Sequence, residues 1–358
     1  MKLEDTLTFD DVLLVPAKSS VTPDMVNTET FVTKNIKLNI PLISSAMDTV
    51  TETNMAIAMA QCGGIGVIHR NLSVSKQVKY VSAVKRFESG IVYNPITLNS
   101  DDTVKTAKKI AKKYNITGFP IVDKEKKILG ILTNRDIRFL EDNSIKVSQI
   151  MTKENLAIVK EPINSKEAKQ IMAKRRIEKL LVVDESNYLL GLLTIKDIEK
   201  SVLNPLACKD ELGRLRCAAA SSVGNEGYER SVSLIDAGAD VIVIDTAHGH
   251  SLDVINAVKR LKKEFANTQV IAGNVVTSDA TKELIDVGAD GIKVGIGPGS
   301  ICTTRVIAGV GMPQLTAIIN CAKEADLHNI PVIADGGIRF SGDFAKSIAS
   351  GASCAMIG

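Results

Sequence analysis

Short apolar segments that end in small or polar residues recur along the chain. Eight of them are too short for helices and have the branched aliphatic composition of buried strands. They are Pro41–Ser45, Gly64–His69, Leu215–Ala220, Val241–Asp245, Val270–Asn274, Gly291–Gly295, Pro331–Asp335 and Ala352–Gly358. Segments of helical periodicity separate most of them: Thr53–Cys62, Glu229–Ala237, Leu252–Phe265, Ala280–Val287, Gln314–Ala325 and Gly342–Ala349. Strands that alternate with helices predict a parallel sheet, and eight strands predict an α/β fold of the closed (β/α)8 TIM-barrel type.

The alternation stops between the second and third predicted strands, where an internal repeat begins. GFPIVDKEKKILGILTNRDI starts at Gly118 and EKLLVVDESNYLLGLLTIKDI starts at Glu178. Asp123 aligns with Asp184, which is an offset of 61 residues, and each copy predicts two strands and flanking helices, one of them at Asp136–Leu140. We therefore expect residues 1–90 and 207–358 to build the barrel. Residues 91–206 would form a separate inserted domain, with copies at about 91–150 and 151–206.

Composition excludes several classes of protein. Aromatic residues make up 4% of the chain, so the core must be aliphatic, as it is where parallel strands are buried on both faces. The net charge of +3 comes without a concentrated basic patch, and the lysines of Lys105–Lys127 fit a solvated face, so no nucleic-acid partner is expected. The six cysteines lack zinc spacing, and no segment predicts a signal peptide or a membrane span. We expect free thiols and a cytoplasmic protein with no membrane partner.

Active sites of barrel enzymes lie at the carboxyl ends of the strands, and the segment Gly295–Arg305 is the strongest candidate there. Its sequence, GIGPGSICTTR, places Cys302 among glycines, hydroxyl groups and Arg305. A thiolate is a strong nucleophile near neutral pH, and a neighbouring cation lowers the pKa of its thiol. The alternative is a buried, inert thiol. Carbonyl groups presented by such a loop could hold a monovalent cation, and its N–H groups an anion.

Polar residues follow other predicted strands. Asp335 precedes Gly336 and Gly337, which predicts a carboxylate for ribose hydroxyls beside a backbone cradle for phosphate. The alternative for the glycines is a turn that needs positive φ. Asp245 and Asn274 could contact a substrate or cofactor, although Asp245 could equally cap a helix.

Several motifs together identify a family. The segments that carry the resemblance are LTFDDVLLVP at Leu7–Pro16, PLISSAMDTVTE at Pro41–Glu52, AGNVVT at Ala272–Thr277, GIGPGSICTTR at Gly295–Arg305 and ADGGIRFSGD at Ala334–Asp343. They closely resemble the IMP dehydrogenases, whose cysteine loop is shared with one close relative, the GMP reductases. The repeated insert is similar to the tandem CBS pair that interrupts the barrel in this family. The resemblance covers the whole chain in order.

The resemblance implies NAD-dependent oxidation of IMP to XMP, the committed step toward guanine nucleotides. Cys302 would attack C2 of the hypoxanthine ring, hydride would pass to NAD+, and water would release XMP from a covalent thioimidate. Thr304 would assist proton transfer. NAD and a potassium ion are the implied cofactors, and the potassium would be held by carbonyl groups of Gly297, Gly299 and Cys302.

The resemblance also assigns binding roles by position. The expected IMP contacts are Ser45, Asn274, Ser300, Asp335, Gly336, Gly337 and Gly358. The expected dinucleotide contacts are Asp245, Thr246, Ala247, Gly295, Ile296 and Gly297. In the insert, Thr133, Asp136, Thr194 and Asp197 match positions that meet a regulatory adenine or guanine nucleotide, although both Asp residues could instead cap helices. The family further implies a homotetramer that can pair into an octamer through the insert.

One element of the family pattern is missing from the sequence. In the family, a flap after the eighth strand carries an Arg–Tyr pair whose Arg is the base for hydrolysis, whereas this sequence stops at Gly358. We therefore expect the chain as given to be C-terminally incomplete and to perform only the redox half of the reaction. Two other functions stay open. One is GMP reductase, which deaminates GMP to IMP with NADPH, and the other is a truncated, non-catalytic nucleotide-sensing module.

Overall fold

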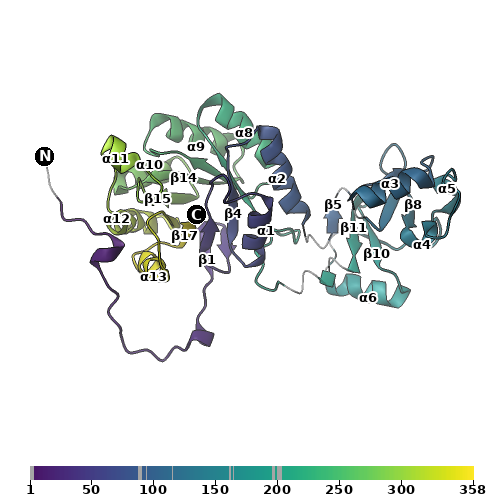
Figure 1. Ribbon diagram of the computed structural model, residues 1–358, viewed down its shortest axis with the longest axis horizontal. Helices are drawn as coiled ribbons and strands as arrows, with labels where there is room; N and C mark the ends of the chain where they lie inside the picture. Colours follow the sequence, from purple (N-terminus) through teal and green to yellow (C-terminus); the bar gives the residue numbers. More distant parts are fainter. Residues whose placement is uncertain are drawn as a thin grey trace. The chain divides into compact units, whose positions relative to one another are not determined.

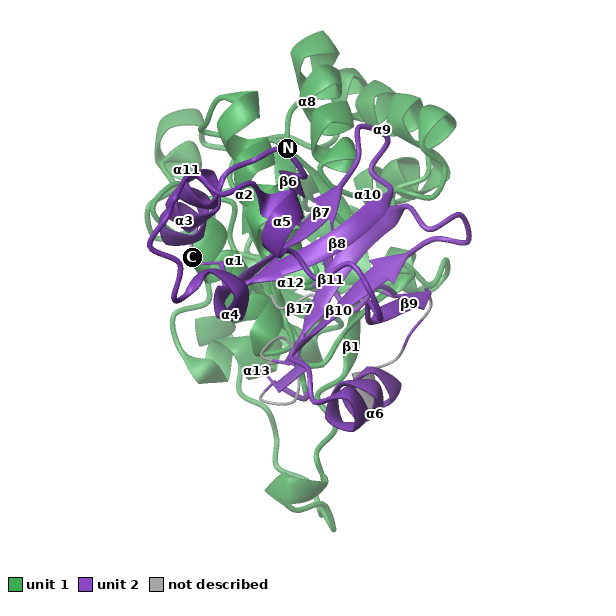
Figure 2. Ribbon diagram, turned by 90° about the vertical axis from the view of Figure 1, so that its right-hand side faces the viewer, with its two compact units in different colours: residues 1–87, 206–210, 215–358 green, residues 88–205, 211–214 purple. Residues whose placement is uncertain are grey.

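A computed structural model describes residues 4–87, 91–93, 95–114, 116–160, 163, 165–195, 198–199 and 204–358. The chain divides into two compact units, coloured separately in Figure 2. Unit 1 comprises residues 1–87, 206–210 and 215–358, and unit 2 comprises residues 88–205 and 211–214. Unit 2 thus begins at Glu88 and takes in Glu211–Arg214, beyond the expected limits of 91 and 206. In the described part of the chain, no helix is long and apolar enough to cross a membrane.

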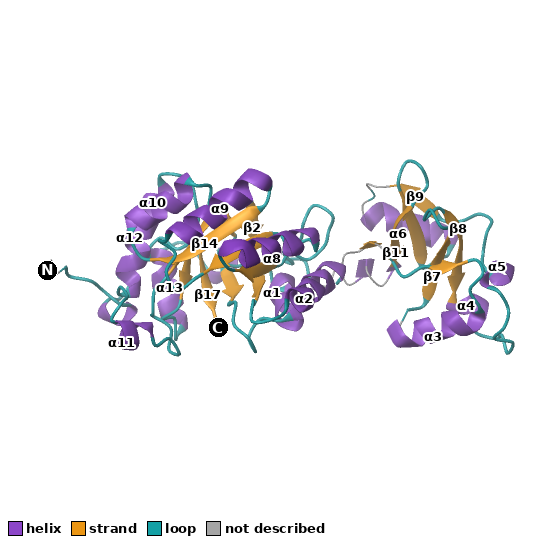
Figure 3. Ribbon diagram, turned by 90° about the horizontal axis from the view of Figure 1, so that it is seen from above, coloured by secondary structure: helices purple, strands orange, loops and turns teal. Residues whose placement is uncertain are grey.

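Unit 1 is a closed barrel of eight parallel strands, which confirms the predicted TIM barrel (Figure 3). The strands are β3 (Leu42–Ser44), β4 (Ile65–Ile68), β12 (Ala218–Ser221), β13 (Val241–Asp245), β14 (Gln269–Val275), β15 (Gly291–Val294), β16 (Val332–Asp335) and β17 (Cys354–Ile357). The barrel closes where β17 pairs with β3, with Ala355 opposite Leu42. Strands β4 and β12 pair directly, although unit 2 is inserted between them in the sequence.

Helices surround these strands (Figure 1). Several begin at a hydroxyl residue that caps the first turn: Ser73, Ser251 and Thr277 each accept a hydrogen bond from the backbone N–H three residues on. The helices are α1 (Thr53–Gln61), α2 (Val74–Arg86), α8 (Gly224–Asp236), α9 (Leu252–Glu264), α10 (Ser278–Asp286), α12 (Gln314–Asp326) and α13 (Ser341–Ala349). The short α11 (Thr304–Ala308) belongs to the loop after β15.

Two apolar layers hold the barrel together. One lies between the helices and the outer faces of the strands, and the other fills the barrel interior. The hairpin of β1 (Thr30–Thr33) and β2 (Ile36–Leu38) contributes Val32, Ile36 and Leu38 to the interior layer. It covers the end where the strands begin, because Lys34 N–H donates to the carbonyl of Asp290, just before β15. The opposite end, where the strands finish, therefore stays available for chemistry. Short 3-10 helices lie at Phe9–Asp11 and Pro23–Met25.

Some predicted boundaries in unit 1 were wrong. The strand expected from Leu215 begins at Ala218, because Leu215 pairs instead with Lys209 in the segment that returns from unit 2. The helix expected from Glu229 begins at Gly224, since its first turn is polar and shows little apolar periodicity. Helix α2 was not predicted at all, although Ser73 caps it.

Unit 2 contains two small sheets. The first has the order β5-β11-β10-β9, with β5 (Ile91–Tyr93), β9 (Ile158–Lys160), β10 (Lys179–Val183) and β11 (Leu189–Thr194). The second has the order β6-β7-β8, with β6 (Leu98–Asn99), β7 (Gly118–Val122) and β8 (Ile128–Thr133). The helices are α3 (Val104–Tyr114), α4 (Asn134–Ile137), α5 (Val147–Ile150) and α6 (Ser165–Arg175). Helix α4 replaces the helix expected at Asp136–Leu140.

The sequence repeat is also a structural repeat. Gly118 pairs with Thr133 across the first hairpin, and Lys179 pairs with Thr194 across the second. Each member of the second pair lies 61 residues after its equivalent in the first pair. The two hairpins also bulge at equivalent places. Their turns repeat as well: the carboxylate of Asp123 accepts from the backbone of Glu125 and Lys127, and Asp184 accepts from the equivalent residues. An apolar cluster around Leu181 and Leu192 joins the copies.

Candidate active site

A buried ion triad joins three barrel strands at their carboxyl ends. Lys293 of β15 is 3% exposed, and its Nζ lies 2.8 Å from Asp245 Oδ1 of β13 and 2.6 Å from Asp335 Oδ2 of β16. Asn274 of β14 donates to the same Asp335 oxygen at 2.9 Å and to the carbonyl of Gly295 at 2.6 Å. The structure thus brings together Asp245, Asn274 and Asp335, which were predicted as site residues. Lys293 was not predicted.

Opposed effects set the charge of Lys293. Burial favours the neutral amine, but the carboxylates of Asp335 and Asp245 outweigh it and raise the pKa of Lys293 above its ordinary value. The ammonium form therefore persists across the physiological range. Two carboxylates and one ammonium leave the triad with one negative charge.

A second buried side chain supports the same strand ends. Gln314, in the first turn of α12, donates through Nε2 to the carbonyls of Val294 and Asp335 at 3.0 and 3.1 Å. A glycine is required at position 295, next to Gln314. A Cβ there would lie 2.1 Å from the Asp335 carbonyl oxygen and 2.9 Å from the Gln314 amide nitrogen. Gly295 therefore allows β15 to approach β16 closely where the cysteine loop begins.

Cys302 is the exposed thiol of this loop. Its Sγ lies 3.3 Å from Thr304 Oγ1, and hydrogen bonds from the Thr304 hydroxyl and backbone N–H lower the pKa of the thiol, with a further contribution from Arg305. The carboxylate of Asp335 opposes this shift, which places it within electrostatic range of the thiol. Cys302 is therefore not the buried cysteine of the alternative, and a lowered thiol pKa is what a nucleophilic cysteine requires.

None of the six cysteines, all of which lie in the described part of the chain, forms a disulfide, but the others differ from Cys302. Burial raises the pKa of Cys208 and of Cys321 to about 11. Cys62 is exposed, but it follows α1 and precedes β4, at the end of the barrel where the strands begin. Cys302 is the exposed cysteine that lies beside the carboxyl ends of the strands.

Arg305 fixes the two ends of the cysteine loop. Its Nε donates to the carbonyl of Ile296 at 3.2 Å, and its Nη2 donates to the carbonyl of Met312. The side chain passes close to Gly297, whose φ is +73°, and a Cβ there would lie 2.6 Å from Arg305 Cγ. The arginine was expected only to lower the pKa of the cysteine, and its role in shaping the loop was missed.

The two glycines after Asp335 contact the cysteine loop. Gly336 and Gly337 have φ of +90° and +80°, so the expected turn with positive φ is present. Cβ atoms at these positions would lie 3.0 and 3.2 Å from the ring of Pro298. The loops after β15 and β16 therefore pack against each other, and each constrains the position of the other.

Ser45, which follows β3, and Gly358, which follows β17, lie together at the carboxyl ends of two paired strands. A Cβ on Gly358 would lie 2.6 Å from Ser45 Oγ. Ser45 is 5% exposed, and its hydroxyl has no hydrogen-bond partner among the described residues. The same is true of the neighbouring Ser44 hydroxyl and of both ring nitrogens of His69, which follows β4. Buried polar groups without hydrogen-bond partners at a barrel opening are typical of a ligand site.

The remaining predicted contacts are less closely grouped. The Thr246 hydroxyl donates to the carbonyl of Gly273 at 2.8 Å, and Ala247 is exposed. Ile296 is 6% exposed, and its carbonyl accepts the hydrogen bond from Arg305 described above. Ser300 is exposed, and the carbonyl of Gly299 accepts a hydrogen bond from the N–H of Cys302 at 3.0 Å.

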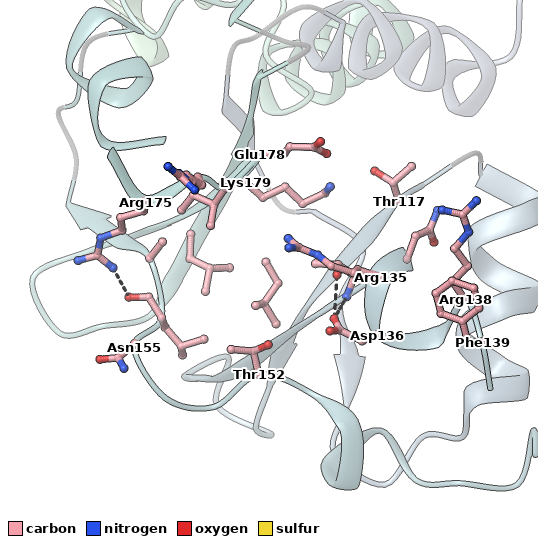
Figure 4. A pocket seen from close by; sticks show the side chains of 18 residues that line it. Thr117, Arg135, Asp136, Arg138, Phe139, Thr152, Asn155, Arg175, Glu178 and Lys179 are labelled. Atoms are coloured by element: carbon pink, nitrogen blue, oxygen red, sulfur yellow. Dashed lines mark hydrogen bonds between the residues drawn. The ribbon is translucent and has the colours of Figure 1, made fainter. Parts of the chain in front are cut away.

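Unit 2 has its own cavity, of about 1040 Å³, between the two repeats (Figure 4). Its cationic lining residues outnumber its acidic ones: they are Arg135, Arg138, Arg175, Arg176 and Lys179, against Asp136 and Glu178. Thr133 and Asp136 line it as well, but Asp136 Oδ2 already accepts from the Thr133 N–H and hydroxyl and so caps α4. Thr194 does not line this cavity. Asp197 lies outside the described residues.

An exposed cysteine with a lowered thiol pKa, on a loop at the carboxyl ends of a (β/α)8 barrel, is the arrangement expected in a class of enzymes that use covalent catalysis. Residues 6–358 match the model of the IMP dehydrogenase / GMP reductase domain, and the chain belongs to this family. It is 56% identical to an inosine-5'-monophosphate dehydrogenase of Aquifex aeolicus, over 100% of this chain and 73% of that relative. It is 52% identical to the enzyme of that name from Bacillus subtilis, over 99% and 73%.

Solved structures show the same fold. A GMP reductase variant from Trypanosoma brucei, in complex with guanosine 5'-monophosphate, is 40% identical, with a TM-score of 0.90, over 99% of this chain and 76% of that one. The GMP reductase of the same organism in complex with guanosine 5'-triphosphate also gives a TM-score of 0.90, over 99% and 86%. Because these matches cover unit 2 as well as the barrel, the insert does not discriminate between the two activities.

Proposed function

We propose that the protein is an NAD-dependent oxidoreductase that converts IMP to XMP. The observation that carries this proposal is the exposed Cys302, whose thiol pKa is lowered by Thr304, on a loop packed against the Asp335 segment at the carboxyl ends of the strands. Membership of the family and identities of 51–56% to curated IMP dehydrogenases support it.

The reaction proceeds in two halves. The Cys302 thiolate adds to C2 of the hypoxanthine ring and makes that carbon tetrahedral, so a hydride can leave it for C4 of the nicotinamide, giving NADH and a thioimidate. Water then adds to the thioimidate carbon and the C–S bond breaks, which yields XMP and the free thiol. The Thr304 hydroxyl, 3.3 Å from Sγ, stabilises the thiolate before attack and again as it leaves.

The remaining predicted residues act in binding. Asp335 accepts hydrogen bonds from the ribose hydroxyls of IMP, and Asn274 orients that carboxylate. Ser45, Ser300, Gly336, Gly337 and Gly358 complete the nucleotide site. Asp245, Thr246, Ala247, Gly295, Ile296 and Gly297 contact the dinucleotide.

A potassium ion fits the cysteine loop by the chemistry of its donors. Carbonyl oxygens of Gly297, Gly299 and Cys302 are hard, neutral ligands, which suit a monovalent cation better than a transition metal. The Gly299 carbonyl already accepts one hydrogen bond and keeps a second lone pair for the ion. A bound cation would order the loop that carries Cys302. Replacing K+ by N-methylglucamine should then abolish most turnover, and full activity without K+ would exclude this role.

The activity test compares two substrate pairs. We expect NADH formation from IMP and NAD+, and loss of about 10³-fold or more of the rate of NADH formation in Cys302→Ala, because the covalent route is removed. Cys62→Ala is the control, since it removes another exposed thiol at the other end of the barrel. GMP reductase is the second candidate, favoured by the 40% identity and TM-score of 0.90 to the trypanosomal structures. NADPH consumption with GMP, without IMP oxidation, would show that the protein is a GMP reductase instead. Inactivity with both substrate pairs would favour the third hypothesis, a non-catalytic nucleotide-sensing module.

For unit 2 we propose a CBS pair that binds a regulatory adenine or guanine nucleotide between its repeats. The cavity has the size of a nucleotide site, and its excess of arginine and lysine suits a polyphosphate. Thr133, Asp136, Thr194 and Asp197 stay the predicted contacts. Equilibrium dialysis with ATP and with GTP should show saturable binding that Arg135→Ala weakens. The exposed Lys146, which pairs with Asp101 outside the cavity, gives the control variant Lys146→Ala. Absence of saturable binding would reject this role.

We also propose a homotetramer that can pair into an octamer. The N-terminal segment supports assembly, because it exposes apolar side chains in an extended stretch: Leu13 is 83% exposed and Val15 is 89% exposed. A run of exposed apolar residues is typical of an interface. Light scattering after size exclusion should give the mass of a tetramer for the wild type and a smaller species for Leu13→Asp/Val15→Asp. A wild-type monomer would exclude this assembly.

A further inference from the structure

The ion triad leaves one oxygen of each carboxylate open. Oδ2 of Asp335 is occupied by Lys293 and Asn274, and Oδ1 of Asp245 is occupied by Lys293. No hydrogen bond from the described residues reaches the other oxygen of either group. Asp335 and Asp245 are 21% and 27% exposed, so the open oxygens can meet a ligand, whereas the ammonium between them is buried.

The backbone around Lys293 is shaped to place its side chain here. Gly273 of β14 lies against it: a Cβ at Gly273 would lie 2.4 Å from the Lys293 carbonyl oxygen and 2.8 Å from its Cβ. The glycine leaves room for the lysine side chain to extend toward the strand ends. A lysine held in this way fixes the positions of both carboxylates through its two ion pairs.

We propose that Lys293 is a positioning residue that couples the two substrate subsites: its ammonium fixes Asp335 for the nucleotide ribose and Asp245 for the dinucleotide, with one free oxygen on each. This inference rests on the proposed function, and it extends it to a residue that touches neither substrate. The two carboxylates belong to different subsites but share one cation. Displacing either therefore disturbs the other.

The test uses Lys293→Met, which keeps the length of the side chain and removes its charge, and Lys293→Arg, which keeps a cation. The matched control is Lys262→Met, because Lys262 forms a comparable partly buried pair with Asp290, at 2.8 Å, at the opposite end of the barrel. We expect KM for IMP and KM for NAD+ each to rise about tenfold or more in Lys293→Met, with a smaller fall in kcat. Lys293→Arg should recover part of both losses, and Lys262→Met should change neither KM.

Binding measurements separate positioning from general destabilisation. Calorimetric titration with IMP, well below the melting temperature of each variant, should show weaker binding to Lys293→Met, which Lys293→Arg partly restores. A merely structural role would lower the melting temperature of both methionine variants and leave the affinity for IMP as in the wild type.

The outcomes are separable from those of the proposed function. Unchanged KM values and an unchanged affinity for IMP in Lys293→Met would overturn the inference even if the wild type oxidises IMP. If the wild type turns over neither substrate pair, the proposed function fails. The calorimetric titration then still decides whether Lys293 positions Asp335 for IMP, and equal affinities of the wild type and Lys293→Met would overturn the inference.

Discussion

At the scale of single residues, the chemistry depends on how differently the same side chain behaves in different surroundings. Burial makes Cys208 and Cys321 hard to ionise, while two hydrogen bonds from Thr304 make Cys302 easier to ionise. Hydrogen bonds to a thiolate stabilise its charged form, and burial without such partners does the opposite. Reactivity at Cys302 is therefore a property of its neighbours.

Thr304→Val should move the ionisation of Cys302 to higher pH. The variant removes the side-chain hydrogen bond that contributes most to lowering the thiol pKa, and the thiolate then forms only in more alkaline solution. The pH dependence of iodoacetamide alkylation at Cys302 measures this shift directly. Turnover at pH 7 should fall about 10²-fold or more, since proton transfer at the sulfur is also impaired.

The neighbouring Thr303 provides the control for that experiment. It precedes α11, but its side chain forms no capping hydrogen bond. Thr303→Val should leave the alkylation profile and the turnover close to wild type. Equal shifts in both variants would show that loop packing, and not the Thr304 hydroxyl, sets the ionisation of the thiol.

Sequence could predict some of these residues and not others. Cys302 and Asp335 follow strands of clear apolar composition, so their place at the strand ends was predictable. Lys293 lies inside such a strand, and nothing local indicates whether a lysine there reaches solvent or a buried partner. Its partners come from β13, earlier in the chain, and from β16, later in the chain, and the parallel pairing of β13 through β16 brings them together.

At the scale of elements, the active-site loops depend on glycines at a few points of close approach. The loop after β15 is fixed by Arg305 at both ends, and the loop after β16 packs against it through Gly336 and Gly337. Positive φ and lack of space coincide at these two glycines, so a side chain there is unfavourable for two independent reasons.

Gly336→Ala should weaken IMP binding and lower the free energy of unfolding by about 1–2 kcal/mol, because of positive φ and a contact at 3.0 Å with Pro298. Gly342→Ala is the matched control: Gly342 lies in the first turn of α13, and a Cβ there meets nothing within 4 Å. It should raise the stability slightly, by up to about 1 kcal/mol, through helix propensity. Denaturant unfolding and calorimetric titration with IMP measure both quantities, and unchanged affinity in Gly336→Ala would argue against a role of this turn in the nucleotide site.

Apolar periodicity predicted the elements well wherever they are strongly amphipathic or buried, and less well elsewhere. Strand β13 was predicted at its observed limits, Val241–Asp245, because its apolar run ends at a carboxylate. Helix α2 was missed because its polar and basic residues mask the buried positions Val81 and Val84. Helix α8 was predicted too short because its first turn is polar and shows little apolar periodicity.

At the scale of the whole molecule, the barrel is continuous without the inserted unit. Strands β4 and β12 pair directly, and the segments that lead to and from unit 2 are attached to the barrel. Lys85, near the end of α2, is buried and lies 2.9 Å from Asp210 of the returning segment and 2.8 Å from Asp240, just before β13. The backbone N–H of Cys208 also donates to the carbonyl of Ala60. These contacts lie within unit 1, so they do not require the repeats.

Replacing residues 88–205 by a short Gly-Ser linker should therefore leave a folded, active barrel. We expect cooperative thermal unfolding and IMP oxidation within a few-fold of the full chain, because every strand pair of the barrel and the Lys85 contacts remain. Any effect of ATP or GTP on turnover should disappear with the repeats.

Adding Lys85→Met to the deletion should cost about 3–5 kcal/mol of unfolding free energy, since Asp210 and Asp240 would lose a buried cation. Circular dichroism and NADH assays measure both outcomes, and a deletion variant that fails to fold would mean that unit 2 stabilises the barrel, contrary to this account.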